Sequence, residues 1–93
     1  MRTGVSALMP NPTRGKVRVA YTLAEQARAS FDVLDVAGRV VSEIPAEVKE
    51  PGRWEVVWAG TDRSGARAAP GVYFLRMTVN GQPVAGRRVI MLR

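Results

Sequence analysis

Apolar and polar residues alternate with a period of two along most of the 93-residue chain. The clearest example is residues 17–23, in which Val17, Val19 and Tyr21 alternate with polar or small residues. This spacing is typical of half-buried β-strands, whose successive side chains point to opposite faces of a sheet. The same pattern predicts strands at residues 17–23, 29–36, 39–44, 53–58, 72–79 and 87–92.

Segments rich in glycine, proline and polar residues separate these strands. Asn80-Gly81 joins two of them and is the strongest short signal for a β-hairpin. Residues 60–65 predict a tight turn, and residues 45–51, which begin and end with proline, predict a polar connection. Only residues 24–29 have a composition compatible with a helix, and this stretch is too short to form a stable one.

Short strands separated by turns at intervals of roughly ten residues predict an all-β fold. We expect an immunoglobulin- or fibronectin III-like antiparallel β-sandwich of about seven strands, formed by residues 14–93. Residues 72–79 carry apolar side chains on both faces, which favours a central position in a sheet. Residues 1–13 contain two prolines and are expected to be a linker or N-terminal arm, entering the domain from a parent chain upstream.

The alternation also predicts the core. Trp54, Val56 and Trp58 fall on one face of their strand, and Tyr73 and Leu75 on one face of theirs. These faces are expected to pack between the two sheets. The predicted core residues are Tyr21, Phe31, Val33, Trp54, Val56, Trp58, Tyr73 and Leu75. The alternative is an exposed sugar-binding platform of Trp54, Trp58 and Tyr73, as in a carbohydrate-binding module.

Composition restricts the available chemistry. Apolar residues make up 46% of the chain and charged residues 24%, which is typical of a globular domain, and no apolar run suffices for an export signal or a membrane span. The absence of histidine and cysteine excludes disulfides, Cys/His zinc sites and imidazole-based catalysis. The carboxylate pairs Asp32/Asp35 and Glu47/Glu50 are not placed to act as catalytic dyads. We therefore expect no enzymatic activity and no cofactor.

The net charge of +6 raises the question of a nucleic-acid partner. The basic residues are scattered along the chain, with a single adjacent pair, and we expect no specific nucleic-acid binding. Several arginines lie on the last predicted hairpin and the tail. They are either a solvated face or a docking surface for an export receptor or an acidic cell-surface polymer. The residues of this candidate surface are Arg76, Arg87, Arg88 and Arg93.

Two acidic turns have structural interpretations. Asp35 is expected to accept backbone N–H groups across a turn in which Gly38 has positive φ, with Arg39 starting the next strand. The turn at Asp62 is too poor in ligands for a calcium loop, because it offers one carboxylate to a site that collects six to eight oxygens. We expect Asp62 to cap a turn. The predicted structural turn residues are Asp35, Gly38, Arg39, Asp62, Gly65 and Gly71.

The spacing of these turns resembles that of two related groups of domains. One is the C-terminal sorting domain of proteins exported by the type IX secretion system. The other is the immunoglobulin-like domain of the flagellar hook-capping protein. The resemblance covers about residues 8–93 and is carried by the following segments in order: Pro10-Asn11-Pro12, Gly15, Tyr21-Thr22-Leu23, Asp35-Val36-Ala37-Gly38-Arg39, Gly52, Trp58-Ala59-Gly60-Thr61-Asp62, Ser64-Gly65, Pro70-Gly71-Val72-Tyr73-Phe74-Leu75-Arg76 and Arg87-Arg88-Val89-Ile90.

The resemblance implies a non-catalytic module at the C-terminus of a secreted bacterial protein, which acts as a type IX sorting signal and attaches the protein to the cell surface. Three departures from the sorting pattern stand out, namely Ala59, Leu34 and arginines in place of terminal lysines. The alternatives are a structural domain of a hook-cap-like or other extracellular assembly and, from another class, a carbohydrate-binding module. The expected partners are export machinery or neighbouring domains of a larger secreted protein, and the oligomeric state stays open.

Overall fold

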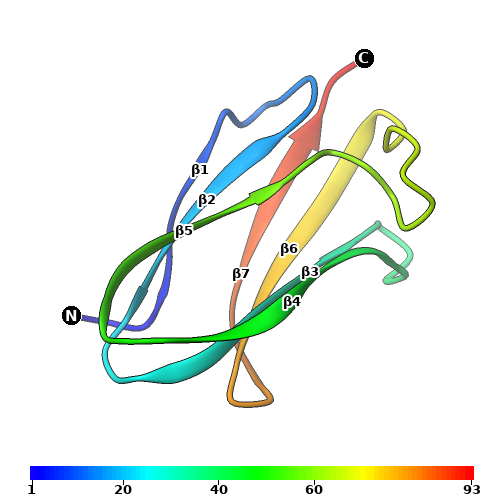
Figure 1. Ribbon diagram of the computed structural model, residues 1–93. Coiled ribbons are helices and arrows are strands. Elements are labelled where there is room, and N and C mark those ends of the chain that lie inside the picture. Colours follow the sequence, from blue (N-terminus) through cyan, green and yellow to red (C-terminus); the bar gives the residue numbers. More distant parts are fainter.

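The computed structural model describes residues 1–93 as two antiparallel β-sheets packed face to face (Figure 1). One sheet has the order β1-β2-β5 and the other the order β4-β3-β6-β7. The predicted seven-stranded, all-β sandwich is therefore confirmed. The strands are β1 Gly4–Met9, β2 Val17–Leu23, β3 Ala27–Leu34, β4 Val40–Lys49, β5 Gly52–Trp58, β6 Gly71–Val79 and β7 Gln82–Met91. The structure has no helix able to cross a lipid bilayer.

The first strand corrects the prediction of a linker over residues 1–13. β1 pairs with β2, and Val5, opposite the core residue Tyr21, is buried. Its alternation is hard to recognise because a bulge between Val5 and Ala7 changes which residues face inward. Residues 4–9 are thus an edge strand of the domain.

After β1 the chain crosses to the other sheet and pairs with the last strand. Thr13 forms a parallel bridge with Met91, and its N–H donates to the carbonyl oxygen of Ile90 at 2.9 Å. Asn11 extends this contact with its side chain, whose Nδ2 donates to Arg88 O at 2.8 Å and whose Oδ1 accepts from Ile90 N at 3.0 Å. The amide of Asn11 therefore pairs with the edge of β7 as a neighbouring strand would.

The fourth strand runs further than predicted. β4 continues through Pro45 to Lys49, although residues 45–51 were expected to be a connection. In the register, Ala29 lies opposite Glu47 and Phe31 opposite Ile44, so β4 carries one extra residue relative to β3 at this point. This bulge lies on an edge strand, where a proline removes no ladder hydrogen bond.

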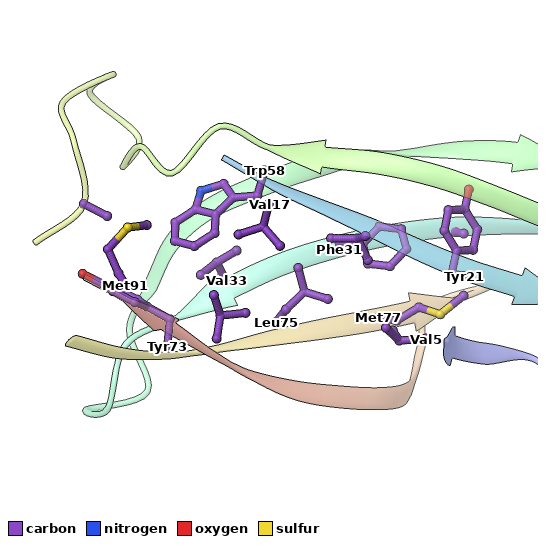
Figure 2. Packing of buried hydrophobic residues seen from close by; sticks show 14 of the residues in the cluster. Val5, Val17, Tyr21, Phe31, Val33, Trp58, Tyr73, Leu75, Met77 and Met91 are labelled. Atoms are coloured by element: carbon purple, nitrogen blue, oxygen red, sulfur yellow. The ribbon is translucent and has the colours of Figure 1, made fainter. Parts of the chain in front are cut away.

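The core lies between the sheets and is filled mainly from β2, β3 and β6 (Figure 2). Two aromatic pairs meet edge to face, Tyr21 with Phe31 at 4.9 Å and Trp58 with Tyr73 at 5.7 Å between ring centroids. Both polar groups of the second pair bond within the protein, Trp58 Nε1 to Thr61 O at 3.0 Å and Tyr73 Oη to Ala69 O at 2.6 Å. No buried side-chain nitrogen or oxygen atom in the structure lacks a hydrogen-bond partner.

Two predicted core residues lie at the margin instead. Trp54 and Val56 share the inward face of β5 with Trp58, yet both are only partly buried and pack against the side of the core. β5 is the edge of the smaller sheet, so the side chains along it have neighbours on one side only. The alternation identifies the correct face but not its distance from the edge.

The difference between the two tryptophans predicts a difference in stability. Trp58 is 2% exposed, so we expect Trp58→Ala to lower the free energy of unfolding by about 3–5 kcal/mol through the lost burial and the cavity left behind. Trp54→Ala should lower it by about 1–2 kcal/mol, because the ring is already partly in water. Urea denaturation followed by circular dichroism measures both, and equal losses would contradict the assignment of these positions.

The contact made by Asn11 gives a second prediction. Asn11→Ala removes two hydrogen bonds to β7 and should lower the free energy of unfolding by about 1–2 kcal/mol. The amide of Ile90 should also exchange faster with solvent, because it loses its acceptor. Gln26→Ala, at an exposed turn residue without a side-chain hydrogen bond, serves as the control for both urea denaturation and amide exchange. Unchanged exchange at Ile90 would show that Asn11 does not seal this edge.

Candidate interaction surface

The outward face of the four-stranded sheet exposes several large apolar side chains. Phe74, at the centre of this face, lies directly opposite Leu34 on β3 and Arg88 on β7. The adjacent row pairs Val72 with Ile90. Phe74, Val72 and Ile90 are 45%, 36% and 37% exposed. Residues directly opposite each other in antiparallel strands point to the same face, so these side chains form one patch, hereafter the Phe74 face.

A two-point ion pair borders the Phe74 face. Arg76 lies opposite Asp32, and its Nε and Nη2 donate to Asp32 Oδ1 and Oδ2 at 3.0 and 2.7 Å. These hydrogen bonds, with the charge of Asp32, raise the pKa of Arg76 above its ordinary value. Arg88 differs from Arg76 because it makes no salt bridge and its guanidinium donates no hydrogen bond. The Phe74 face thus combines apolar side chains, a neutralised pair and one free cation.

The structure separates the four arginines of the predicted docking surface. Arg76 and Arg88 lie on the Phe74 face, two positions apart in register. Arg87 points to the other side of β7, where its Nη2 donates to Val5 O at 2.6 Å. Arg93 lies at the chain end, where its carbonyl oxygen accepts from Arg14 Nη1 at 2.6 Å.

The apolar part of the Phe74 face was not assigned to a site from the sequence. Its signal is present there, since residues 72–79 are apolar on both faces. That pattern predicts a strand in the middle of a sheet, and β6 does lie between β3 and β7. However, no element covers the outward side of β6, so Val72 and Phe74 face solvent.

Asp35 organises the turn between β3 and β4. Its Oδ1 accepts from the backbone N–H groups of Ala37 and Arg39 at 2.9 and 3.0 Å, and its Oδ2 from Arg39 Nε at 3.0 Å. Gly38 has a φ of 84°, a conformation open to glycine at little cost. Several hydrogen bonds hold the pKa of Asp35 below its ordinary value, and the bond from the Arg39 N–H contributes most to this lowering.

Asp62 has the same role in the connection between β5 and β6. Its Oδ1 accepts from Ser64 Oγ at 2.7 Å and from the N–H groups of Ser64 and Ala66 at 2.9 and 3.2 Å. These hydrogen bonds lower the pKa of Asp62, and the bond from the Ser64 hydroxyl contributes most. Gly65 follows with a φ of 90°, and Gly71, with a φ of 152°, opens β6. These contacts are those of a turn cap, and no group of three or more acidic side chains gathers at this turn or elsewhere in the structure.

The three aromatic residues of the alternative sugar platform do not share an exposed surface. Trp58 and Tyr73 are 2% and 7% exposed and contact each other in the core. Trp54 is partly buried, its Nε1 donates to Glu50 O at 2.7 Å, and Lys49 Nζ lies 4.9 Å from its ring centroid. A flat aromatic platform is therefore not formed by these residues.

The sandwich and its turns occur in a known family of domains. A family model, described as the FlgD Ig-like domain, matches residues 10–82. The chain belongs to the FlgD Ig-like domain family. The resemblance to hook-capping domains predicted from the turn spacing is thereby confirmed. No curated protein matches this FlgD Ig-like domain.

Solved structures extend the comparison. Dimeric latent PorU from Porphyromonas gingivalis has a TM-score of 0.79 and 20% identity over 95% of this chain and 9% of PorU. PorZ, a surface component of the type IX secretion system of that organism, has a TM-score of 0.61 and 24% sequence identity over 96% of this chain and 11% of PorZ. FlgD from Xanthomonas campestris, which caps the flagellar hook, has a TM-score of 0.62 and 24% sequence identity over 92% of this chain and 62% of FlgD.

These likenesses show the fold shared by the FlgD Ig-like domain and parts of larger proteins. The chain spans only about a tenth of PorU and of PorZ. In each of them the same sandwich is one portion of a much longer polypeptide.

The two acidic turns of this FlgD Ig-like domain predict loss of stability in acid. A carboxylate whose pKa is lowered by folding stabilises the native state above the unfolded pKa, and that contribution is lost as the pH falls through the folded pKa. The ordinary pKa of Asp35 and Asp62 is 3.8, so the loss begins at about pH 5 and continues below pH 4. The urea midpoint should therefore fall between about pH 5 and pH 2, and less steeply in Asp62→Asn, which keeps an acceptor oxygen but does not titrate.

The control is Glu25→Gln, at an exposed turn carboxylate without a hydrogen bond. Its urea midpoints should follow those of the unaltered chain across the same pH range. If Asp62→Asn showed the full acid dependence as well, the turn carboxylate would not be a source of it.

Proposed function

We propose that this domain is a non-catalytic module of a larger secreted bacterial protein and acts as a sorting and surface-attachment domain for type IX secretion. The observation that carries the proposal is the match of nearly the whole chain to small portions of PorU and PorZ, the second a surface component of that secretion system. A module that recurs as a tenth of larger proteins acts through the surfaces it offers to other parts or partners.

The distribution of polar groups supports a binding role instead of catalysis. Asp35 and Asp62 are occupied by turn N–H groups, and Asp32 by Arg76. With no histidine or cysteine in the chain, these carboxylates are the main candidates for acid–base work, and each already has a structural partner. The Phe74 face, by contrast, exposes large apolar side chains to solvent.

The chemistry of the Phe74 face suits a folded protein partner. Its apolar side chains would leave water on docking, and Arg88, directly opposite Phe74, favours a partner with a carboxylate at the matching position. The opposite charges of Asp32 and Arg76 neutralise each other, so this pair adds little to the net charge of the face. The export machinery is the partner we assign to it.

An export experiment tests the proposal. Residues 1–93 are fused to the C-terminus of a reporter that carries its own signal for the periplasm, in a type IX-competent strain and in a strain lacking that system. We expect the reporter outside the cell, or on its surface, in the competent strain only. Retention in the periplasm of both strains would argue against a sorting role.

Matched surface variants locate the docking site in the same assay. Phe74→Ser with Arg88→Glu should reduce export severalfold, because it removes both the apolar centre and the cation of the face. The control, Val57→Ser with Arg18→Glu, makes the same kind of change on the outward side of the other sheet and should export normally. Urea midpoints of both double variants distinguish loss of docking from loss of folding.

A structural role in an extracellular assembly is the second candidate. The FlgD Ig-like family match over residues 10–82 favours it, since FlgD caps the flagellar hook. In this case the Phe74 face would pack against another domain or subunit of the assembly. The export assay separates the two roles, because a purely structural domain leaves the reporter in the periplasm.

A further inference from the structure

The two sheets expose four edge strands, and two of these edges are sealed on the same side of the sandwich. β1 and β7 pack against each other there. The edge of β7 is bonded by Asn11 and Thr13, and Arg87 Nη2 donates to Val5 O on β1. Unpaired N–H and C=O groups on an edge are sites where another strand can add, so these contacts block addition on this side.

The third edge, β4, is protected by its own sequence. Pro45 lies on it, and two register shifts interrupt its pairing with β3. Glu47 and Lys49 lie opposite the inward-facing residues Ala29 and Ala27 and therefore point toward the core side. Proline, bulges and inward-pointing charges are the means by which natural edge strands avoid pairing.

The fourth edge, β5, has none of these features. β5 pairs with β2 without a register shift over its whole length, from Gly52 opposite Leu23 to Trp58 opposite Val17. It contains no proline, and no hydrogen bond from another element reaches its free edge. Its outward side chains are Arg53, Glu55 and Val57.

The space beside β5 lies over an uncovered strand. The smaller sheet has three strands and the larger sheet four. Because β1 lies against β7 at one side of the sandwich, the smaller sheet has no strand opposite β4 at the other side. Ser42 and Ile44 point to the core side of β4, opposite the buried residues Val33 and Phe31, yet no residue of β4 is buried. Ile44 is thus only partly buried at the margin of the core, and although Arg63 of the β5–β6 connection reaches Glu43 on β4, no strand of the smaller sheet covers Ile44.

We propose that the free edge of β5, with the uncovered face of β4, accepts a single extended strand from a partner polypeptide. The strand would pair with β5, become the fourth strand of the smaller sheet and cover Ile44. The width missing from that sheet is one strand, about 4.8 Å. This site is independent of the export role and lies on a different part of the molecule from the Phe74 face.

A second copy of the domain does not fit the same edge. In an antiparallel pair of β5 strands the larger sheets of both copies lie on the same side. Each β4 projects one strand beyond its own β5, so each β4 would overlap the β3 of the other copy. A single extended segment avoids this overlap.

The side chains around the edge define the partner strand. Opposite Val56, and over Ile44, the partner strand should carry an apolar residue that faces inward. Opposite Trp54, which contacts Lys49, it should carry a small polar residue. On the outward side, Glu55 favours a basic residue opposite it, and Arg53 an acidic one. The partner is thus a strand of alternating pattern with a base and an acid two positions apart.

A tethered probe tests the site. The hexapeptide Val-Val-Lys-Thr-Glu-Thr is placed before Met1 through a ten-residue Gly-Ser linker, which reaches roughly 17 Å. The linker starts near the right place, because Gly4 lies opposite Thr22, which lies opposite Arg53. We expect slower amide exchange in residues 53–57 than in the chain without the probe.

Charge-swapped versions test the register. Exchanging Lys and Glu in the probe places like charges opposite Glu55 and Arg53 and should weaken closure about tenfold. In the double variant Arg53→Glu with Glu55→Lys the preference should reverse, so that the swapped probe protects the amides better. Both positions are exposed, and the variant is expected to fold normally.

Three results would overturn the proposal. The first is no protection of residues 53–57 by the matched probe. The second is equal protection by both probes, which would show that the strand does not pair in the inferred register. The third is concentration-dependent protection of the same amides in the chain without a probe, which would assign this edge to a second copy.

Discussion

The fold depends on burying one face of each sheet against the other. The inward positions of β2 and β3 are almost completely removed from water, and the Trp58–Tyr73 and Tyr21–Phe31 contacts tie the two sheets together at opposite ends of the core. The chain contains no disulfide, so this packing has no covalent support. Because a shift of one residue would turn a strand's apolar side chains outward, the same burial also determines the register.

Most of the fold was accessible from the sequence because strand alternation and turn chemistry are local properties. Asn80, with a φ of 51°, and Gly38 have the backbone conformations that their residue types favour. Two errors arose where non-local pairing overrides the local pattern. A bulge hides the alternation of β1, and the edge position of β4 allows Pro45 inside a strand.

The interaction surfaces were less accessible for a related reason. Alternation shows that Val72 and Phe74 share a face of their strand, but whether a face is covered depends on how many layers the domain has. The arginines of the last hairpin were grouped by their closeness in sequence, whereas the strand period sends Arg87 and Arg88 to opposite sides of β7. The imbalance between three and four strands is also visible only once the sheets are assembled.

Because only one side of the sandwich is sealed, a folded neighbour and an extended strand would bind at different places on the domain. On the sealed side, Asn11 and Thr13 bond the edge of β7 and Arg87 bonds Val5 O on β1, which obstructs the addition of a further strand there. The Phe74 face points away from the four-stranded sheet, while the free edge of β5 lies in the plane of the other sheet. A folded neighbour on the Phe74 face and an extended strand on β5 would therefore not compete for space. Because β5 also carries Trp58, a strand added beside it would reinforce the part of the smaller sheet that closes over the aromatic core.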